Sequence, residues 1–88
     1  MGKNFQLEVL CMVRLDELLP GDRCRVTELQ TLGPMRRRLR ELGLVEGTAV
    51  TCLGFSPLGD PGAYEVLGAV IALRKRDGAG VLVERAPT

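Results

Sequence analysis

The sequence has no histidine and no tryptophan among its 88 residues, and only one tyrosine and two phenylalanines. Histidine is the side chain that most often carries protons near neutral pH and is the commonest neutral metal ligand. The thiols therefore have no histidine to act as a base, and neither a G-x-S-x-G turn nor a Walker lysine motif is present. These absences predict a protein that is not an enzyme.

Excess charge and long apolar runs are also missing. Twelve Lys and Arg balance eleven Asp and Glu, leaving a formal charge of +1, so no net field attracts nucleic acid or an anionic membrane. Few aromatic rings are available to stack bases, and we expect no nucleic-acid binding. The longest apolar stretch, residues 67–73, is far shorter than the roughly 20 residues of a membrane helix, so no membrane insertion is expected.

The three cysteines, Cys11, Cys24 and Cys52, are odd in number and form no C-x-x-C pair. This pattern suits reduced thiols in the cytoplasm better than a disulfide framework. Cys24 and Cys52 fall on predicted inward strand faces, where free cysteine packs as a small hydrophobe. Cys11, next to the thioether of Met12, is the remaining candidate for a transition metal ion. Otherwise we expect no cofactor.

What is present is enough for one small domain. The composition is 45% hydrophobic and 26% charged, close to that of ordinary globular proteins. A chain of this length can build a single core.

Two turn-then-strand units are recognisable. Pro20-Gly21 has the residue types of a type II turn, and alternation over residues 22–29 then points Cys24 and Val26 to one side. The pattern recurs after Gly47, with Val50 and Cys52 at the same offsets. Both segments are predicted to be strands with one buried face.

A helix is predicted between these strands. Gly33-Pro34 opens and Gly43 closes a segment in which Met35, Leu39 and Leu42 recur at helical spacing, so the helix is expected near residues 34–42. Proline at the start and glycine past the end are the expected asymmetry.

Three more short strands follow a loop at residues 57–62 that is rich in proline and glycine. They contain Tyr64 and Val66, then Ile71 and Leu73, then Val81 and Val83, with breaks at Gly68 and at residues 77–80. Five strands and one short helix predict a mainly β fold, a small closed barrel with the helix lying across one opening.

Four motifs in this order resemble the FeoA family, ferrous iron transport protein A, and the SH3-like domain at the C-terminus of iron-dependent repressors. They are Leu-x-x-Leu-x-Pro-Gly at 15–21, Arg-Arg-Leu-x-x-Leu-Gly-Leu-x-x-Gly-Thr at 37–48, Pro-Leu-Gly-Asp-Pro at 57–61 and Ile-Ala-Leu-Arg-Lys at 71–75. The resemblance covers residues 13–84 and implies a five-stranded SH3-like barrel. It leaves an N-terminal extension, residues 1–12, and a tail, residues 85–88. The extension is either an additional strand or arm, or a surface for self-association.

The resemblance also implies a function. It is that of a non-catalytic cytoplasmic accessory protein that binds and modulates a FeoB-type ferrous iron transporter through the transporter's cytosolic GTP-binding domain. Through this partner it is expected to lie at the inner face of the membrane. The alternative is a carrier or sensor of transition metal related to the repressor domain. Whether the chain forms a homo-oligomer is left open.

Two segments are candidates for contact with this partner. The helix carries Arg36, Arg37, Arg38 and Arg40, and Arg74, Lys75 and Arg76 follow a predicted strand. These cations form either a solvated face or a docking patch, because guanidinium groups pair bidentately with carboxylates. The second candidate is the loop with Leu58, Gly59 and Asp60, which offers an apolar anchor and an acceptor but could simply turn the chain.

Overall fold

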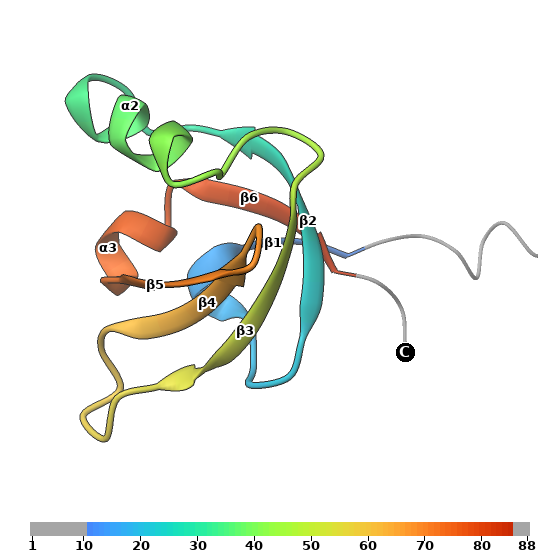
Figure 1. The fold of residues 1–88 in the computed structure, drawn as a ribbon, viewed down its shortest axis with the longest axis vertical. Helices are drawn as coiled ribbons and strands as arrows, with labels where there is room; N and C mark the ends of the chain where they lie inside the picture. Colours follow the sequence, from blue (N-terminus) through green and yellow to red (C-terminus); the bar gives the residue numbers. More distant parts are fainter. Residues whose placement is uncertain (1–10, 86–88) are drawn as a thin grey trace, which may run out of the picture.

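The computed structural model of the chain describes residues 11–85, so most of the predicted extension and tail lies outside the described residues. Six antiparallel strands form one sheet in the order β1-β6-β2-β3-β4-β5 (Figure 1). The strands are β1 (Cys11–Arg14), β2 (Arg23–Leu29), β3 (Ala49–Phe55), β4 (Gly62–Val66), β5 (Ala69–Leu73) and β6 (Val81–Arg85). A 3-10 turn, η1 (Leu15–Glu17), follows β1, and the helices are α2 (Pro34–Glu41) and α3 (Lys75–Gly78).

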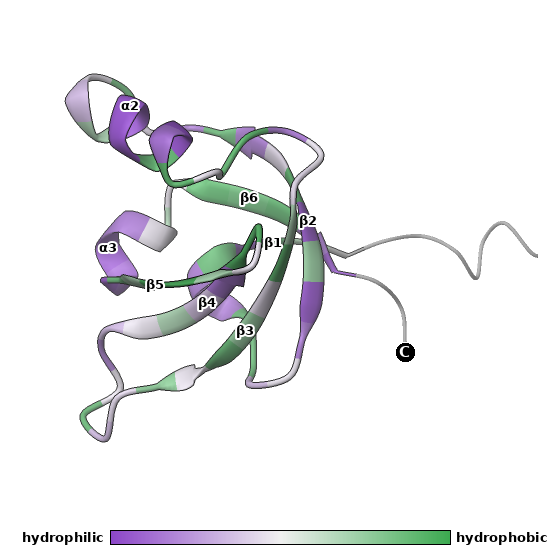
Figure 2. Cartoon of the chain, in the orientation of Figure 1, coloured by the Kyte–Doolittle hydropathy of each residue, from purple (hydrophilic) through white to green (hydrophobic). Residues whose placement is uncertain are grey.

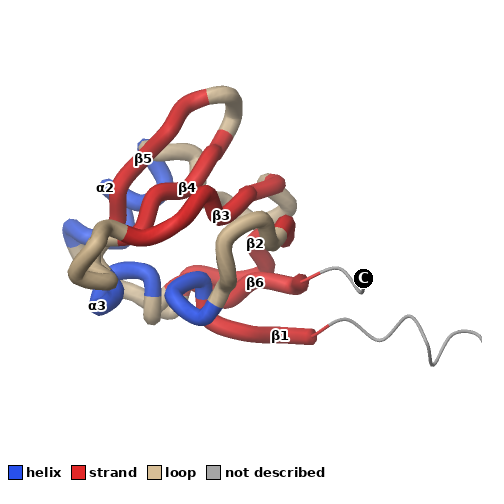
Figure 3. The backbone as a smooth tube through the Cα atoms, turned by 90° about the horizontal axis from the view of Figure 1, so that it is seen from below, coloured by secondary structure: helices blue, strands red, loops and turns tan. Residues whose placement is uncertain are grey.

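The predicted mainly β, SH3-like architecture with a short helix is confirmed, but two details differ. The sheet has six strands, because β1 pairs with β6. The alternation pattern did not mark β1, but the strand includes residues 11 and 12 of the extension, for which an additional strand was one of the two expectations. The sheet curls around the core without closing into a hydrogen-bonded barrel (Figure 3). The reason is that β6 pairs with β1 and β2, which leaves β1 and β5 as the two edges.

The strands bury the side chains that the alternation predicted. Both Cys24 and Cys52 face inward and are buried as free thiols. Tyr64, with 1% of its surface exposed, is the largest fully buried side chain. The core consists of Leu15, Leu18, Cys24, Val26, Leu29, Leu39, Leu44, Val50, Cys52, Tyr64, Val66, Leu73, Val81 and Val83.

Helix α2 lies at one end of the sheet and has the predicted inward face. Leu39 is fully buried, and Met35 and Leu42 pack partly buried against the core. Gly33 and Gly43, which flank the helix, both have positive φ, a conformation that glycine adopts without steric cost. These flanking glycines explain why the predicted boundaries agree with the observed ones to within one residue.

Helix α3 was not predicted, because the residues Asp77-Gly78-Ala79-Gly80 have turn-forming composition. The helix is a single short turn that packs against η1. Gly78 is buried there, and a β-carbon on it would lie 3.4 Å from the backbone nitrogen of Asp16. Tertiary packing therefore selects a helix where local composition indicated only a turn.

Candidate partner-binding surface

The predicted contact segments lie on the same side of the molecule. Helix α2, helix α3 and the loop between β3 and β4 follow one another along the left side of Figure 1, and the view from below places them on the left as well (Figures 1 and 3). Both helices are strongly hydrophilic, in contrast to β5 and β6 (Figure 2). Helix α2 and the loop lie at opposite ends of this side of the molecule, with α3 between them (Figure 1).

The arginines of α2 divide into two kinds. Arg37, Arg38 and Arg40 are exposed, and none of them forms an ion pair with a carboxylate among residues 11–85. Arg36 is half-buried, and its Nη1 donates a hydrogen bond to the carbonyl oxygen of Leu29 at 2.9 Å. Arg36 therefore ties α2 to the end of β2, and the other three guanidinium groups remain available to a partner.

Three more exposed cations, Arg74, Lys75 and Arg76, lie at the start of α3. The structure pairs none of them with a described carboxylate. The Nζ of Lys75 lies over the ring of Phe55, 5.6 Å from its centroid, which is within cation–π range. We call the six exposed cations of the two helices the basic face: Arg37, Arg38, Arg40, Arg74, Lys75 and Arg76.

The loop at residues 56–61, the 56–61 loop, is held by hydrogen bonds. The hydroxyl of Ser56 donates to the carbonyl oxygen of Asp60 at 2.7 Å, and the backbone N–H of Asp60 donates to Ser56 Oγ at 3.1 Å. The backbone N–H of Gly59 donates to the carbonyl oxygen of Ser56 at 2.7 Å, and that of Ser56 to Pro61 at 3.0 Å. The Asp60–Pro61 peptide bond is cis.

The three predicted loop residues have different roles in this arrangement. Oδ1 of Asp60 accepts a hydrogen bond from the backbone N–H of Lys75 at 2.9 Å, so the carboxylate joins the loop to α3. Gly59 has a φ of +89°, which suits glycine at a turn. Leu58 projects away from the chain, with 94% of its surface exposed.

Sequence reasoning missed Ser56 and Phe55 as parts of this loop. A serine near an aspartate in a proline- and glycine-rich segment is a signal that could have found Ser56, because both side chains commonly bond to nearby backbone groups. No local pattern indicates that Phe55 lies beneath Lys75, since the contact depends on the packing of β3 against the start of α3.

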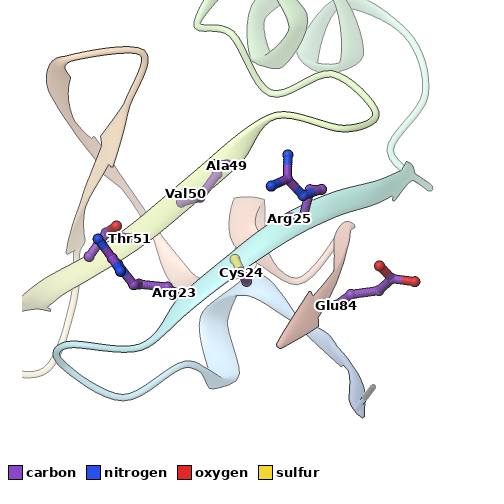
Figure 4. A pocket seen from close by; sticks show the side chains of 7 residues that line it. All are labelled: Arg23, Cys24, Arg25, Ala49, Val50, Thr51 and Glu84. Carbon is purple, nitrogen blue, oxygen red and sulfur yellow. The ribbon is translucent and has the colours of Figure 1, made fainter. Parts of the chain in front are cut away.

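A separate hollow of about 400 Å³ lies on β2 and β3. Its side chains do not converge on a common point: Arg23 lies beside Thr51 at one end, and Glu84 lies at the other (Figure 4). Arg25 is already engaged, because its Nη1 donates to the carbonyl oxygen of Gly47 at 2.8 Å. This arrangement indicates no ligand.

The described residues, 11–85, contain no group of three or more Cys, Asp or Glu that could hold a metal ion. Burial raises the pKa of the Cys24 thiol to about 12 and also raises the pKa of Cys52. Both thiols are thus protonated at neutral pH, whereas metals bind the thiolate. The side chain of Cys11, the candidate from the sequence, lies outside what the structure describes, and that hypothesis stays a prediction.

None of the helices within residues 11–85 has the length and apolar character needed to cross a membrane.

Known proteins of two kinds, a protein family and a curated relative, both resemble this chain over most of its length. The family model described as FeoA domain matches residues 13–85. A Porphyromonas gingivalis protein, described as a fusion of Fe(2+) transport protein A with the Fe(2+) transporter FeoB, is 35% identical over 72 residues, which are 82% of this chain. The match spans only 8% of the length of that fusion protein.

Solved structures extend the likeness to three dimensions. The solution structure of FeoA from Chlorobium tepidum is 38% identical, with a TM-score of 0.78 over 83% of this chain and 70% of that one. The crystal structure of Stenotrophomonas maltophilia FeoA complexed with zinc, described as an SH3 domain protein, is 33% identical. Its TM-score is 0.72 over 81% of this chain and 88% of that one.

Proposed function

Since the chain belongs to the FeoA family of ferrous iron transport, we propose that it is a non-catalytic cytoplasmic protein that binds the cytosolic GTP-binding domain of a FeoB-type transporter. The observation that carries this proposal is the Porphyromonas gingivalis relative, in which a protein A part and a FeoB part are joined in one polypeptide. In a fusion protein the covalent link keeps the two parts at a high effective concentration relative to each other, so they need not meet by diffusion. Separate chains need an interface to reach the same proximity.

The basic face supports the proposal as the docking surface. Arg37, Arg38 and Arg40 project from a helix that Arg36 and Leu39 fix to the body of the protein. Cations without carboxylate partners of their own can pair bidentately with carboxylates on another protein. At physiological salt such a patch acts only within about 8 Å, so it accelerates association without giving the whole molecule a net field.

Binding kinetics of the chain with the isolated cytosolic domain of the transporter, at two ionic strengths, test this proposal. Arg37→Gln with Arg38→Gln should slow association, and the effect should be larger at low salt. The control matched in charge is Arg23→Gln with Arg25→Gln on β2, which also removes the hydrogen bond from Arg25 to Gly47. Circular dichroism confirms that both variants fold.

If wild type does not bind the cytosolic domain, the proposed function is wrong. If it binds and the two double variants behave alike at low salt, the arginines of α2 are a solvated face and the contact lies elsewhere.

A carrier or sensor of transition metal is the second candidate, and one observation favours it. The Stenotrophomonas maltophilia relative is a zinc complex. In this chain the candidate ligand is Cys11, and metal titration, described in the Discussion, distinguishes the two functions.

A further inference from the structure

We propose that Leu58 is an apolar anchor of this interface, which inserts into a pocket rimmed by carboxylates on the transporter's cytosolic domain. The inference rests on the proposed function and adds to it the residue that determines how long the complex lasts. Leu58 is 94% exposed, more than the other large apolar side chains that are exposed among residues 11–85. An exposed leucine is common on protein surfaces, so exposure does not carry the argument alone.

The rigidity of the 56–61 loop is the second observation. Ser56 and Asp60 lie two residues before and two residues after Leu58, and two hydrogen bonds join them across the loop. The backbone N–H of Gly59 also donates to the carbonyl oxygen of Ser56. The bond from Lys75 to Asp60 then fixes the loop to α3. A loop backbone that is already ordered loses little further conformational entropy on binding, and this preorganisation increases affinity.

The surroundings of Leu58 indicate the chemistry of its partner. Arg74 and Lys75 lie at the start of α3, to which the loop is fixed, and α2, the arginine-bearing helix, lies at the other end of the same side (Figure 1). A second copy of this chain docking by the same side would bring like charges together, which is unfavourable. The complementary surface is therefore an apolar pocket with acidic residues around it.

The test is the rate of dissociation from the cytosolic domain. Leu58→Ser should increase this rate and weaken affinity about 10-fold or more, because buried apolar anchors dominate binding energy and most changes in affinity lie in dissociation. The matched control is Leu19→Ser, at another exposed leucine, 62% exposed in the turn before β2, which should leave binding unchanged.

Asp60 provides a second pair of variants that tests the rigidity argument. Asp60→Ala removes the acceptor for Lys75 and should weaken binding while Leu58 remains. Asp60→Asn keeps a side-chain oxygen at the same position and should restore most of the affinity. Failure of Asp60→Asn to rescue would contradict a positioning role and assign the carboxylate charge to the contact itself.

The outcomes separate this inference from the proposed function. If wild type binds and the Leu58→Ser and Leu19→Ser variants bind equally well, Leu58 is not an anchor although the proposed function stands. If wild type does not bind, the proposed function and the inference fail together. If Leu58→Ser instead converts an oligomer of the free protein into a smaller species in solution, Leu58 contacts a second copy of this chain and the inference is overturned.

Discussion

Gly43, just after α2, lies against Leu67 at the tip of the β4–β5 hairpin: a β-carbon on Gly43 would be 2.8 Å from Leu67 Cδ1. The φ of Gly43 is +102°, in the region that residues with a β-carbon avoid. Gly43→Ala should therefore lower the free energy of unfolding by about 1–2 kcal/mol in urea titration.

The double variant Gly43→Ala with Leu67→Ala separates the contact with Leu67 from the other causes of the penalty. The end of the exposed Leu67 side chain can move, so most of the penalty should persist when Leu67 is shortened, from the backbone and from the close approach to Cγ1 of the buried Val66 at 3.1 Å. If the penalty disappears in the double variant, steric contact with Leu67 is the cause.

Leu39 connects α2 to the core and has no exposed surface. Leu39→Ala should cost about 2–5 kcal/mol, since it removes buried methyl groups and leaves a cavity. Leu32→Ala, at an exposed leucine just before the helix, is the control and should change stability by less than about 0.5 kcal/mol. A similarly small effect at Leu39 would contradict the assignment of the buried face of α2.

Ferrous ion should not bind this chain tightly. No cluster of candidate ligands exists among residues 11–85, and the missing histidines remove the ligand that would best complement carboxylates. Anaerobic calorimetry should show no stoichiometric site of low micromolar affinity. A saturable one-to-one isotherm that disappears in Cys11→Ser would instead support the carrier or sensor function.

Local sequence was sufficient for most of the fold. The alternation around Cys24 and Val26 predicted which side of β2 is buried. The glycines that flank α2 predicted where the helix begins and ends, because both signals lie in neighbouring residues of the sequence. Two elements depended on distant contacts: the strand pattern did not mark β1, although an additional strand was one expectation for residues 1–12, and α3 was not predicted. β1 becomes a strand by pairing with β6, and α3 forms where Asp60 accepts from Lys75 and Gly78 packs on η1.

The candidate site, too, was predicted from the sequence only in those features that local composition shows. The sequence identified the cations and the loop, because clustered arginines and turn-forming residues are visible as composition. It could not tell that Arg36 and Asp60 are occupied by hydrogen bonds to Leu29 and Lys75, since these partners come from other elements. We therefore propose contacts through Arg37, Arg38, Arg40 and Leu58 together with the exposed start of α3, and positioning roles for Arg36 and Asp60.

The buried thiols of Cys24 and Cys52 and the buried phenol of Tyr64 should make the stability of the fold decrease at alkaline pH. Desolvation raises the pKa of Cys24 from 9.0 to about 12 and that of Tyr64 from 10.0 to about 12, and it also raises the pKa of Cys52. In the unfolded chain these groups lose their protons first, so between pH 9 and about 12 the unfolded state binds fewer protons than the folded state. Stability is then fully present below pH 9 and decreases as the pH rises, by about 1.4 kcal/mol per pH unit for Cys24 above pH 9 and by a similar amount for Tyr64 above pH 10.

Urea titrations at intervals from pH 8 upward, with a reductant present to keep the thiols free, measure this slope. Cys24→Ala removes one of the groups that titrate first in the unfolded chain, so its stability should decrease less steeply above pH 9 than that of wild type. The comparison uses slopes, because the substitution also removes a buried side chain and lowers stability at every pH. Equal slopes for the two proteins would show that the Cys24 thiol ionises as readily in the folded chain as in the unfolded one.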